Sequence, residues 1–295
     1  MNRSPAHDAA YYHKIHIRNK RIHNAGKVLK VLSIVLLIVL VLLPFYVAVL
    51  YAFKPVSEVT ANRLAFTQNP TLQNFHNVIF KNEQFLIGFK NSIINTIPTV
   101  IILMGFTSMA AWVLARHNSL FYQLMYALLT LGLLIPFQCY VLPLYLNWYN
   151  LDLVSTNIGF IIARSGLQVS ISLVAVTGFV KTVPRELEQA AGIDGCNRFQ
   201  TFWKIVFPLM TPINVTQMVL NSLFIWNDYS TAIILLRTKE SKSLTLAQII
   251  YFNENTTMLN EAFAFFILSM IPILILYLSC QKYVISGITA GAVKG

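Results

Sequence analysis

The chain has 295 residues, of which 56% are hydrophobic and only 11% are charged, and its mean hydropathy is +0.61. A soluble domain carries about 25% charged residues, so this composition excludes a soluble globule and predicts helices that span a membrane. The net charge of +11 would suggest nucleic acid binding in a soluble protein, but here the positive-inside rule explains it. The three cysteines lie far apart, which argues against a disulfide framework or a metal site.

In chain order, six runs are long and apolar enough to cross a bilayer. We expect them at residues 31–53, 91–115, 120–144, 157–180, 205–236 and 262–281. The first run is too long for the apolar part of a signal peptide, so we expect no cleaved leader. Because six is even, both termini are expected on one side of the membrane.

The basic residues predict which side that is. The segments on the side of the termini carry 14 lysines and arginines and those on the other side carry seven, with Arg164 inside the fourth run. This bias predicts that a basic tail at 1–30, a loop at 181–208 and a C-terminal tail at 286–295 are cytoplasmic. On the other side, residues 54–90 are expected to form a small ordered cap.

Two of the runs are expected to depart from a straight helix. Pro136 and Pro143 fall in the third run, and either a bent helix that lines a cavity or a kink that serves packing would explain them. The fifth run, 205–236, is longer than one span needs, so a broken or re-entrant helix is expected there.

The polar, basic loop at 181–208 predicts two short helices hinged at a glycine. Pro184 suits the first turn of the first helix, and Gly195 suits the left-handed position that ends it. Asn197 can cap the second helix. In that helix, apolar residues recur at helical spacing: Phe199, Phe202, Trp203 and Val206.

Two interpretations of this loop are open. Its aromatic face could lie among lipid headgroups, or the loop could dock on a cytoplasmic protein. Ala190 and Ala191 favour docking, because small side chains on one helix face let another surface approach the backbone closely.

The segment from Glu188 to Gly195, followed by Ile205 and Pro208, resembles the EAA loop of ABC importer permeases. The family motif reads E-A-A, three residues, G, nine residues, I-x-L-P; here Gln189 replaces the usual glutamate and Phe207 the usual leucine. The resemblance assigns ATPase coupling to Glu188, Gln189, Ala190, Ala191, Asp194, Gly195, Ile205 and Pro208.

Other segments resemble the carbohydrate branch of that family, in particular subunits similar to the second permease of the maltose transporter. Among them are Asn69-Pro70-Thr71, Trp226-Asn227-Asp228 and the stretch from Gly287 to Gly295. The resemblance covers residues 30–295. It implies the all-α fold of a type I importer permease, with six transmembrane helices, in the cell membrane of a prokaryote.

The resemblance also implies an assembly that works by alternating access. The chain would pair with a homologous second permease and two ATPase subunits, and an extracytoplasmic binding protein would deliver a sugar or oligosaccharide. No two of its glycines stand five positions apart, so the chain lacks a G-x-x-x-x-G-K-[ST] phosphate loop. ATP and Mg would therefore be bound by the partners. In this chain we expect no cofactor, no metal, no catalytic residues and no nucleic acid partner.

The residues that could meet the substrate cluster near the end of the fifth run. They are Asn221, Trp226, Asn227, Asp228 and Tyr229. Amides, carboxylates and aromatic rings match the hydroxyls and ring faces of sugars. The cluster could line the translocation path, or Asp228 could stabilise a break in the helix. Arg164 is expected to extend its side chain to the membrane interface, with a gating role as the alternative.

Two segments outside the runs have open roles. The loop from Arg237 to Glu261, with Tyr251 and Phe252 followed by Asn253, Glu254 and Asn255, either touches a docked binding protein or is solvated. In the C-terminal tail, glycines recur every fourth residue at 287, 291 and 295, and contact with the ATPases is the favoured interpretation.

Competing function classes remain beside the sugar importer. The same scaffold could carry a non-sugar solute such as a polyol phosphate. An ATP-independent transporter or channel would need ionisable residues buried mid-span or inverted repeats. A membrane scaffold without transport would leave the structured loop without a purpose other than anchoring.

Overall fold

The computed structural model describes the backbone of residues 5–61, 65–252 and 258–292, and the side chains of residues 26–59, 65–251 and 258–284. All regular structure in these ranges is helical. Four of the described helices are long and apolar enough to cross a membrane, over Gly26–Ala52, Glu83–Arg116, Asn157–Val180 and Leu259–Val284. The predicted all-α membrane fold is confirmed.

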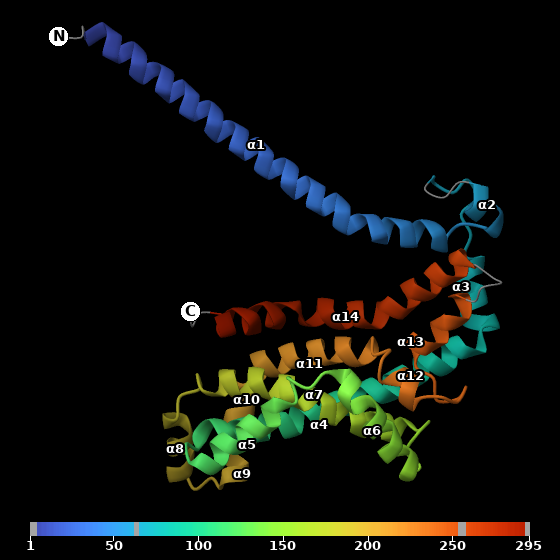
Figure 1. Cartoon of the computed structure of the whole chain (residues 1–295). Coiled ribbons are helices and arrows are strands. Elements are labelled where there is room, and N and C mark those ends of the chain that lie inside the picture. The colour runs from blue at the N-terminus through green and yellow to red at the C-terminus, as the bar shows by residue number, and fades with distance from the viewer. Residues whose placement is uncertain (1–4, 62–64, 253–257, 293–295) are drawn as a thin grey trace.

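The long helices are α1 (Pro5–Ala52), α4 (Glu83–Arg116), α7 (Asn157–Val180) and α14 (Leu259–Ala292). In the bundle, α4 packs against α7, and α11 (Thr211–Trp226) packs against both α4 and α14. Helix α1 meets α14 only towards its C-terminal end and then extends away from the bundle (Figure 1).

The predicted third run, 120–144, is not one helix. The structure has α5 (Leu120–Leu131) and α6 (Phe137–Asn150), with a turn between them. Pro136 is the residue before α6, with φ −60° and ψ 142°. A proline lacks the N–H that would continue the helix, and it disfavours helical geometry at the residue before it. Pro143 lies inside α6 without breaking it.

The predicted fifth run, 205–236, is broken in two places. Helix α11 ends at Trp226, and the chain turns before the short helix α12 (Ala232–Leu235). At its other end, the π-helical η2 (Phe202–Val206) leads into α10 (Phe207–Leu209), which ends at Met210. Pro212 has no N–H to donate to the Pro208 carbonyl four residues earlier, and the Thr211 hydroxyl donates to that carbonyl instead, at 2.6 Å.

Both predicted tails are helical in the parts that the structure describes. Residues 5–30 belong to α1 and continue without interruption into the first run. Residues 286–292 belong to α14, and residues 293–295 lie outside the described part. Over residues 5–30, the predicted basic tail is therefore the first half of a long helix.

The segment 54–90, predicted as an ordered cap, contains α2 (Val56–Ala61), α3 (Gln73–His76), η1 (Asn77–Lys81) and the start of α4. The buried Asn74 holds this cap to the bundle. Its amide donates to the carbonyls of Ala52 and Lys54 at 2.8 Å each, and its oxygen accepts from Asn260 at 2.7 Å. One side chain therefore ties α1, α3 and α14 together.

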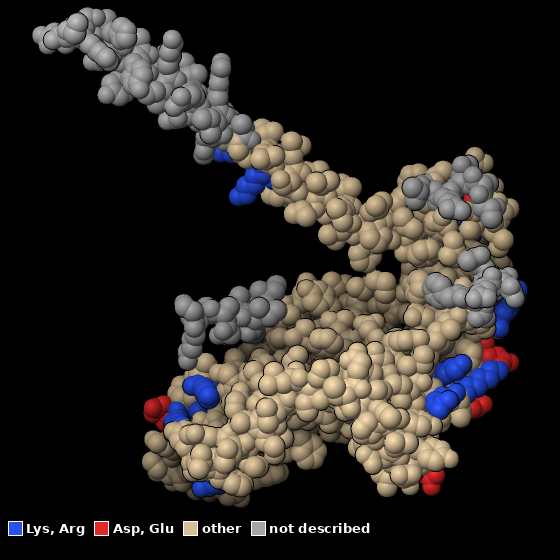
Figure 2. Space-filling view, in the orientation of Figure 1, with Lys and Arg blue, Asp and Glu red and all other residues tan. Residues whose placement is uncertain are grey.

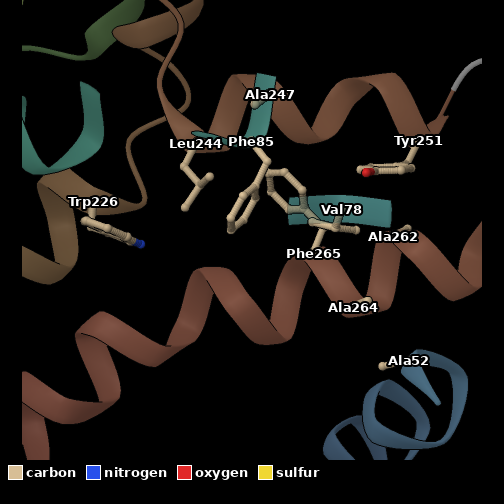
Figure 3. Packing of buried hydrophobic residues seen from close by; sticks show 10 residues of the cluster. All are labelled: Ala52, Val78, Phe85, Trp226, Leu244, Ala247, Tyr251, Ala262, Ala264 and Phe265. Carbon is tan, nitrogen blue, oxygen red and sulfur yellow. The ribbon is translucent and has the colours of Figure 1, made fainter. Parts of the chain in front are cut away.

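A cluster of buried side chains joins the cap to the bundle, with members from α1, η1, α4 and α14 (Figure 3). The ring of Phe265 in α14 meets Phe85 of α4 edge to face at 5.3 Å, and it lies 5.7 Å from Tyr251. The short helix α13 (Leu244–Ala247) covers the cluster, followed by η3 (Gln248–Phe252). Burial of apolar side chains here, at about 25 cal/mol per Å2, fixes the loop before α14 on the bundle.

Charged residues gather at the two ends of the bundle, and the face between them in Figure 2 shows no Lys, Arg, Asp or Glu among the described residues. Along α1, Val31, Leu36 and Leu42 are each more than half exposed in this single chain. Such surface fits lipid or another membrane protein as its neighbour.

Candidate functional site

The loop at 181–208 lies at one end of the bundle, opposite the cap (Figure 1). Its first helix is α8 (Glu186–Ile193), which begins two residues after Pro184. Gly195 has φ +84°, which confirms the predicted left-handed position. The Cys196 N–H donates to the Ala191 carbonyl at 2.9 Å and the Gly195 N–H to the Gly192 carbonyl at 3.2 Å, the two bonds of a Schellman motif.

The second helix, α9 (Arg198–Thr201), begins with the predicted Asn197 cap. The Asn197 side chain accepts from the Gln200 N–H and the Gln200 side chain accepts from the Asn197 N–H, both at 2.9 Å. This capping box fixes where the chain turns from α8 towards the bundle.

Glu188 fastens α8 to α4. Its Oε1 accepts a hydrogen bond from the Arg116 Nε at 2.8 Å and lies 2.6 Å from the Arg116 Nη2. Its Oε2 accepts a hydrogen bond from the Trp112 indole N–H at 3.0 Å. Arg116 also donates to the Val183 carbonyl at 2.9 Å. Both ion-pair side chains are mostly buried, at 10% and 15% exposed. Glu188 therefore faces the bundle, where α4 holds its carboxylate.

The small-residue face predicted for α8 divides between two sides of the helix. Ala191 is buried against the bundle, whereas Ala190 is exposed. The outer side of α8 presents Leu187, Ala190 and Ile193, and Ile193 is 87% exposed. Gln189 and Asp194 are exposed beside them. This apolar ridge with polar flanks, residues 187, 190 and 193, is called the α8 ridge below.

The predicted aromatic stripe of the second helix also divides. Phe202 and Val206 are buried in the core that α4 and α7 share, whereas Phe199 is 68% and Trp203 37% exposed. Ile205 is half-buried and Pro208 exposed. The loop is therefore packed on the bundle along one side and open along the other.

The five substrate-path candidates do not form one site. Asn221 is buried and exchanges hydrogen bonds with Ser172 of α7 at 3.0 and 3.2 Å. The Trp226 indole donates to the Ser269 carbonyl of α14 at 3.0 Å. Asn227 is exposed and donates to the Leu223 carbonyl, and Tyr229 is 44% exposed.

Asp228 is buried and paired with Arg164 of α7 at 3.2 Å. Its other carboxylate oxygen accepts from the Thr231 N–H at 3.0 Å, and its carbonyl accepts from the Thr245 hydroxyl. Arg164 is only 15% exposed, so the predicted extension to the interface is wrong: the guanidinium turns inward to a carboxylate. These contacts favour the helix-break interpretation of Asp228.

Two of the candidates, Trp226 and Asn227, line a cavity of about 510 Å3 between α1, α11 and α14. Polar groups of Thr245 and Gln248 lie on its wall, and Phe45 contributes an aromatic ring. Mixed aromatic and amide linings suit ligands with an apolar face and hydroxyl groups. This cavity brings together two of the five residues predicted to line the translocation path.

A seam of buried polar side chains between α4, α7 and α11 was not predicted. Ser108 of α4 donates to Asn214 of α11 at 3.0 Å, and Asn157 of α7 donates to Asn91 of α4 at 3.2 Å. The signal was in the sequence, since Asn91, Asn95 and Thr99 recur every fourth residue on one face of α4. Interhelical hydrogen bonds of this kind hold membrane helices together.

No group of three metal-ligating side chains occurs among the described residues. Outside the spanning helices, the pKa of Tyr251 is raised, mainly because burial disfavours its charged form. The α8 ridge and the cavity at Trp226, called the Trp226 cavity below, are the two regions that contain predicted site residues.

Residues 84–289 match the family described as the inner membrane component of binding-protein-dependent transport systems. The chain is 30% identical over 275 residues to the probable starch degradation products transport system permease protein AmyC of Thermoanaerobacterium thermosulfurigenes, covering 93% of this chain and 99% of that one. It is 33% identical over 256 residues to the melibiose/raffinose/stachyose import permease protein MelC of Bacillus subtilis, covering 86% and 91%.

Among solved structures, the fold is similar to a chain of a bacterial ABC transporter involved in the import of the acidic polysaccharide alginate. The TM-score is 0.79 at 21% identity, and the match covers 90% of this chain and 98% of that one. The family match begins in the first turn of α4 and runs through α7, the α8 loop and α11 into α14. The chain therefore belongs to the family of inner-membrane components of binding-protein-dependent transport systems, and it has the fold of an ABC importer permease.

Proposed function

We propose that this chain is one of two permease subunits of an ATP-driven importer of a sugar or oligosaccharide, coupled to ATPase partners through α8. The proposal rests on one observation: α8 is bonded to α4 on one side, and its other side, the α8 ridge, is exposed. Glu188 fixes α8 on α4, while Ile193 on the other side is 87% exposed. An anchored helix with an apolar outer side is suited to enter a cleft on a partner and transmit its movement.

The anchor gives the movement a route into the bundle. A push on α8 reaches α4 through the Glu188 carboxylate bonded to Arg116 and Trp112. A second route runs from the capped α9 through η2 into α11. Because the two routes end in helices that pack on each other, closure of the ATPases would tilt them together and change which end of the bundle is open.

ATP and Mg are assigned to the partners, and this chain to a non-catalytic role. The chain has no phosphate-binding glycine loop, so the energy for uptake must enter from outside it. The proposed assembly has a homologous second permease, two ATPase subunits and an extracytoplasmic binding protein. In this arrangement the α8 end and both termini face the cytoplasm, as the excess of basic residues indicates.

Sugar as the solute is supported by the relatives and by the Trp226 cavity. AmyC and MelC are named for starch degradation products and for melibiose, raffinose and stachyose. The cavity combines the aromatic rings of Trp226 and Phe45 with the amides of Asn227 and Gln248. A polyol phosphate would need a cationic group to bind its phosphate, and none lines this cavity.

The test is a cross-link between α8 and the ATPase in the whole importer. The three native cysteines are first replaced by serine, and Ile193→Cys or Ala190→Cys is paired with cysteines along the candidate ATPase cleft. Asn118→Cys, exposed near the same end of the bundle, is the matched control. We expect cross-links from positions 190 and 193 only, and ATP-dependent sugar accumulation in proteoliposomes.

Two results would reject the proposal. Accumulation of sugar by this chain alone, without ATP, would favour an ATP-independent transporter. Labelling of Ile193→Cys by an impermeant reagent from outside intact cells would place the α8 ridge on the wrong side for coupling.

A further inference from the structure

A polar cavity of about 620 Å3 opens at the end of the bundle opposite α8. It lies where η1, the first turn of α4, η3 and the first turn of α14 meet. Its volume falls within the ~300–1,000 Å3 range of small-molecule sites. None of its lining residues belongs to the α8 ridge or the Trp226 cavity, so it is separate from both.

Among the described residues that line the cavity, the formal charges cancel. Lys81 and Lys239 are matched by Glu83 and Glu261, and Glu83 accepts from the Lys239 ammonium at 3.2 Å. The Asn77 amide donates to Glu261 at 2.8 Å. A lining of zero formal charge gives no net attraction to an anion or a cation, yet it offers many donors and acceptors. This chemistry fits a neutral ligand with hydroxyl groups.

One amide in the wall has no partner. Gln84 lines the cavity and is only 9% exposed, and neither its amide nitrogen nor its amide oxygen has a hydrogen-bond partner among the described residues. Its neighbours are satisfied: Asn82 donates to the Tyr251 hydroxyl at 2.8 Å and accepts from the Gln84 N–H at 3.0 Å. An unpaired buried amide is costly, and a turn of this flexible side chain into the cavity would let a ligand satisfy both atoms.

We propose that this cavity is a saccharide-binding site on the permease itself. The Gln84 amide, the Glu261 carboxylate and the Lys81 ammonium bind hydroxyl groups, and the exposed Ile250 and Met258 side chains cover an apolar ring face. The inference rests on the proposed function for the orientation of the chain. In that orientation the site lies at the extracytoplasmic mouth, where it holds a sugar between release by the binding protein and entry into the path.

The test uses the whole importer in nanodiscs, without the binding protein. Equilibrium binding is measured for labelled raffinose and maltotriose as neutral probes and for sorbitol 6-phosphate as the anionic probe. Gln84→Leu removes the unpaired amide at similar volume, and Gln123→Leu on α5 is the matched control, since that side chain is remote from the cavity. If Gln84→Leu does not assemble, Glu261→Gln replaces it.

We expect binding of a neutral trisaccharide, none of the phosphate, and an affinity loss of about tenfold in Gln84→Leu with no change in Gln123→Leu. Equal binding by wild type and both cavity variants would overturn the inference. ATP-driven accumulation of a trisaccharide that does not bind here refutes the site but not the proposed function. Saccharide binding here without any accumulation refutes only the proposed function. Absence of both binding and accumulation refutes both.

Discussion

Arg164 and Asp228 form an ion pair of 3.2 Å between α7 and the turn that follows α11. Arg164 is seven residues into α7, about 10 Å from the start of that helix. Buried charges in a membrane protein are costly unless they are paired, so this contact joins two helices at the point where α11 stops. Because Arg164 neutralises Asp228, the chain can leave helical geometry after Trp226 without burying an unpaired charge.

Neutralising one member of this pair should be worse than neutralising both. In Arg164→Gln or Asp228→Asn, the remaining charge is buried and unpaired, at a cost of about 3–5 kcal/mol. We expect a clear fall in the thermal stability of the nanodisc-embedded importer for each single variant. The double variant should recover most of the loss. Additive losses in the double variant would show that the two charges act independently.

The Glu188 anchor should be required for coupling and not for ATP hydrolysis. Glu188→Gln weakens the bonds to Arg116, and Arg116→Gln leaves Glu188 with only the Trp112 indole. Loss of one charge-assisted contact corresponds to about 1.5–3 kcal/mol. We expect continued ATP hydrolysis with sugar uptake reduced at least several-fold in both variants. Glu186→Gln, an exposed change in the same helix, is the control and should leave the coupling ratio unchanged.

Whether a residue can replace Gly195 should depend on how well it adopts a positive φ, and not on the size of its side chain. Its φ of +84° is unfavourable for most residues, and there is open space around it. Asparagine tolerates left-handed geometry, whereas a β-branched residue does not. We therefore expect near-normal uptake for Gly195→Asn and uncoupled ATP hydrolysis for Gly195→Val, measured side by side in proteoliposomes. Equal loss in both would indicate a steric role at a partner surface.

The cap should loosen in acid because of Glu58. The pKa of the Glu58 carboxyl is lowered, and the Thr67 hydroxyl is the largest cause, larger than the opposing effect of desolvation. The N–H groups of Gln68 and Asn69 donate to the same carboxylate at 3.1 and 3.2 Å and lower the pKa further. The pKa of Glu58 in the folded protein lies below its ordinary value of 4.5, so the ionised carboxylate stabilises the cap fully above pH 4.5. This stabilisation is lost as the pH falls through the folded-state pKa.

Amide hydrogen exchange at Gln68 and Asn69, corrected for the intrinsic rate, measures this effect. Protection should be constant from neutral pH down to about pH 5 and fall below it. In Glu58→Gln, protection should be lower throughout and should not respond to pH in that range. A wild-type profile that stays flat to pH 3 would contradict the role of the carboxylate.

The sequence by itself determined the membrane class and the local geometry of the α8 loop. Hydropathy over long runs decides between lipid and water as solvent, and it needs no knowledge of contacts. The left-handed Gly195 and the Asn197 cap were predictable for the same reason, because backbone conformation at a helix end depends on residues a few positions apart.

Only the tertiary structure decided which way the charged side chains point. Glu188 turns inward to Arg116 and Arg164 turns inward to Asp228, although their partners lie 72 and 64 positions away in the chain. A sequence pattern specifies which side chains can ionise, but the free energy of burying a charge depends on the partner that the fold brings beside it. The Trp226 cavity and the polar cavity around Gln84 have the same origin, since each is enclosed by helices that are distant in the sequence.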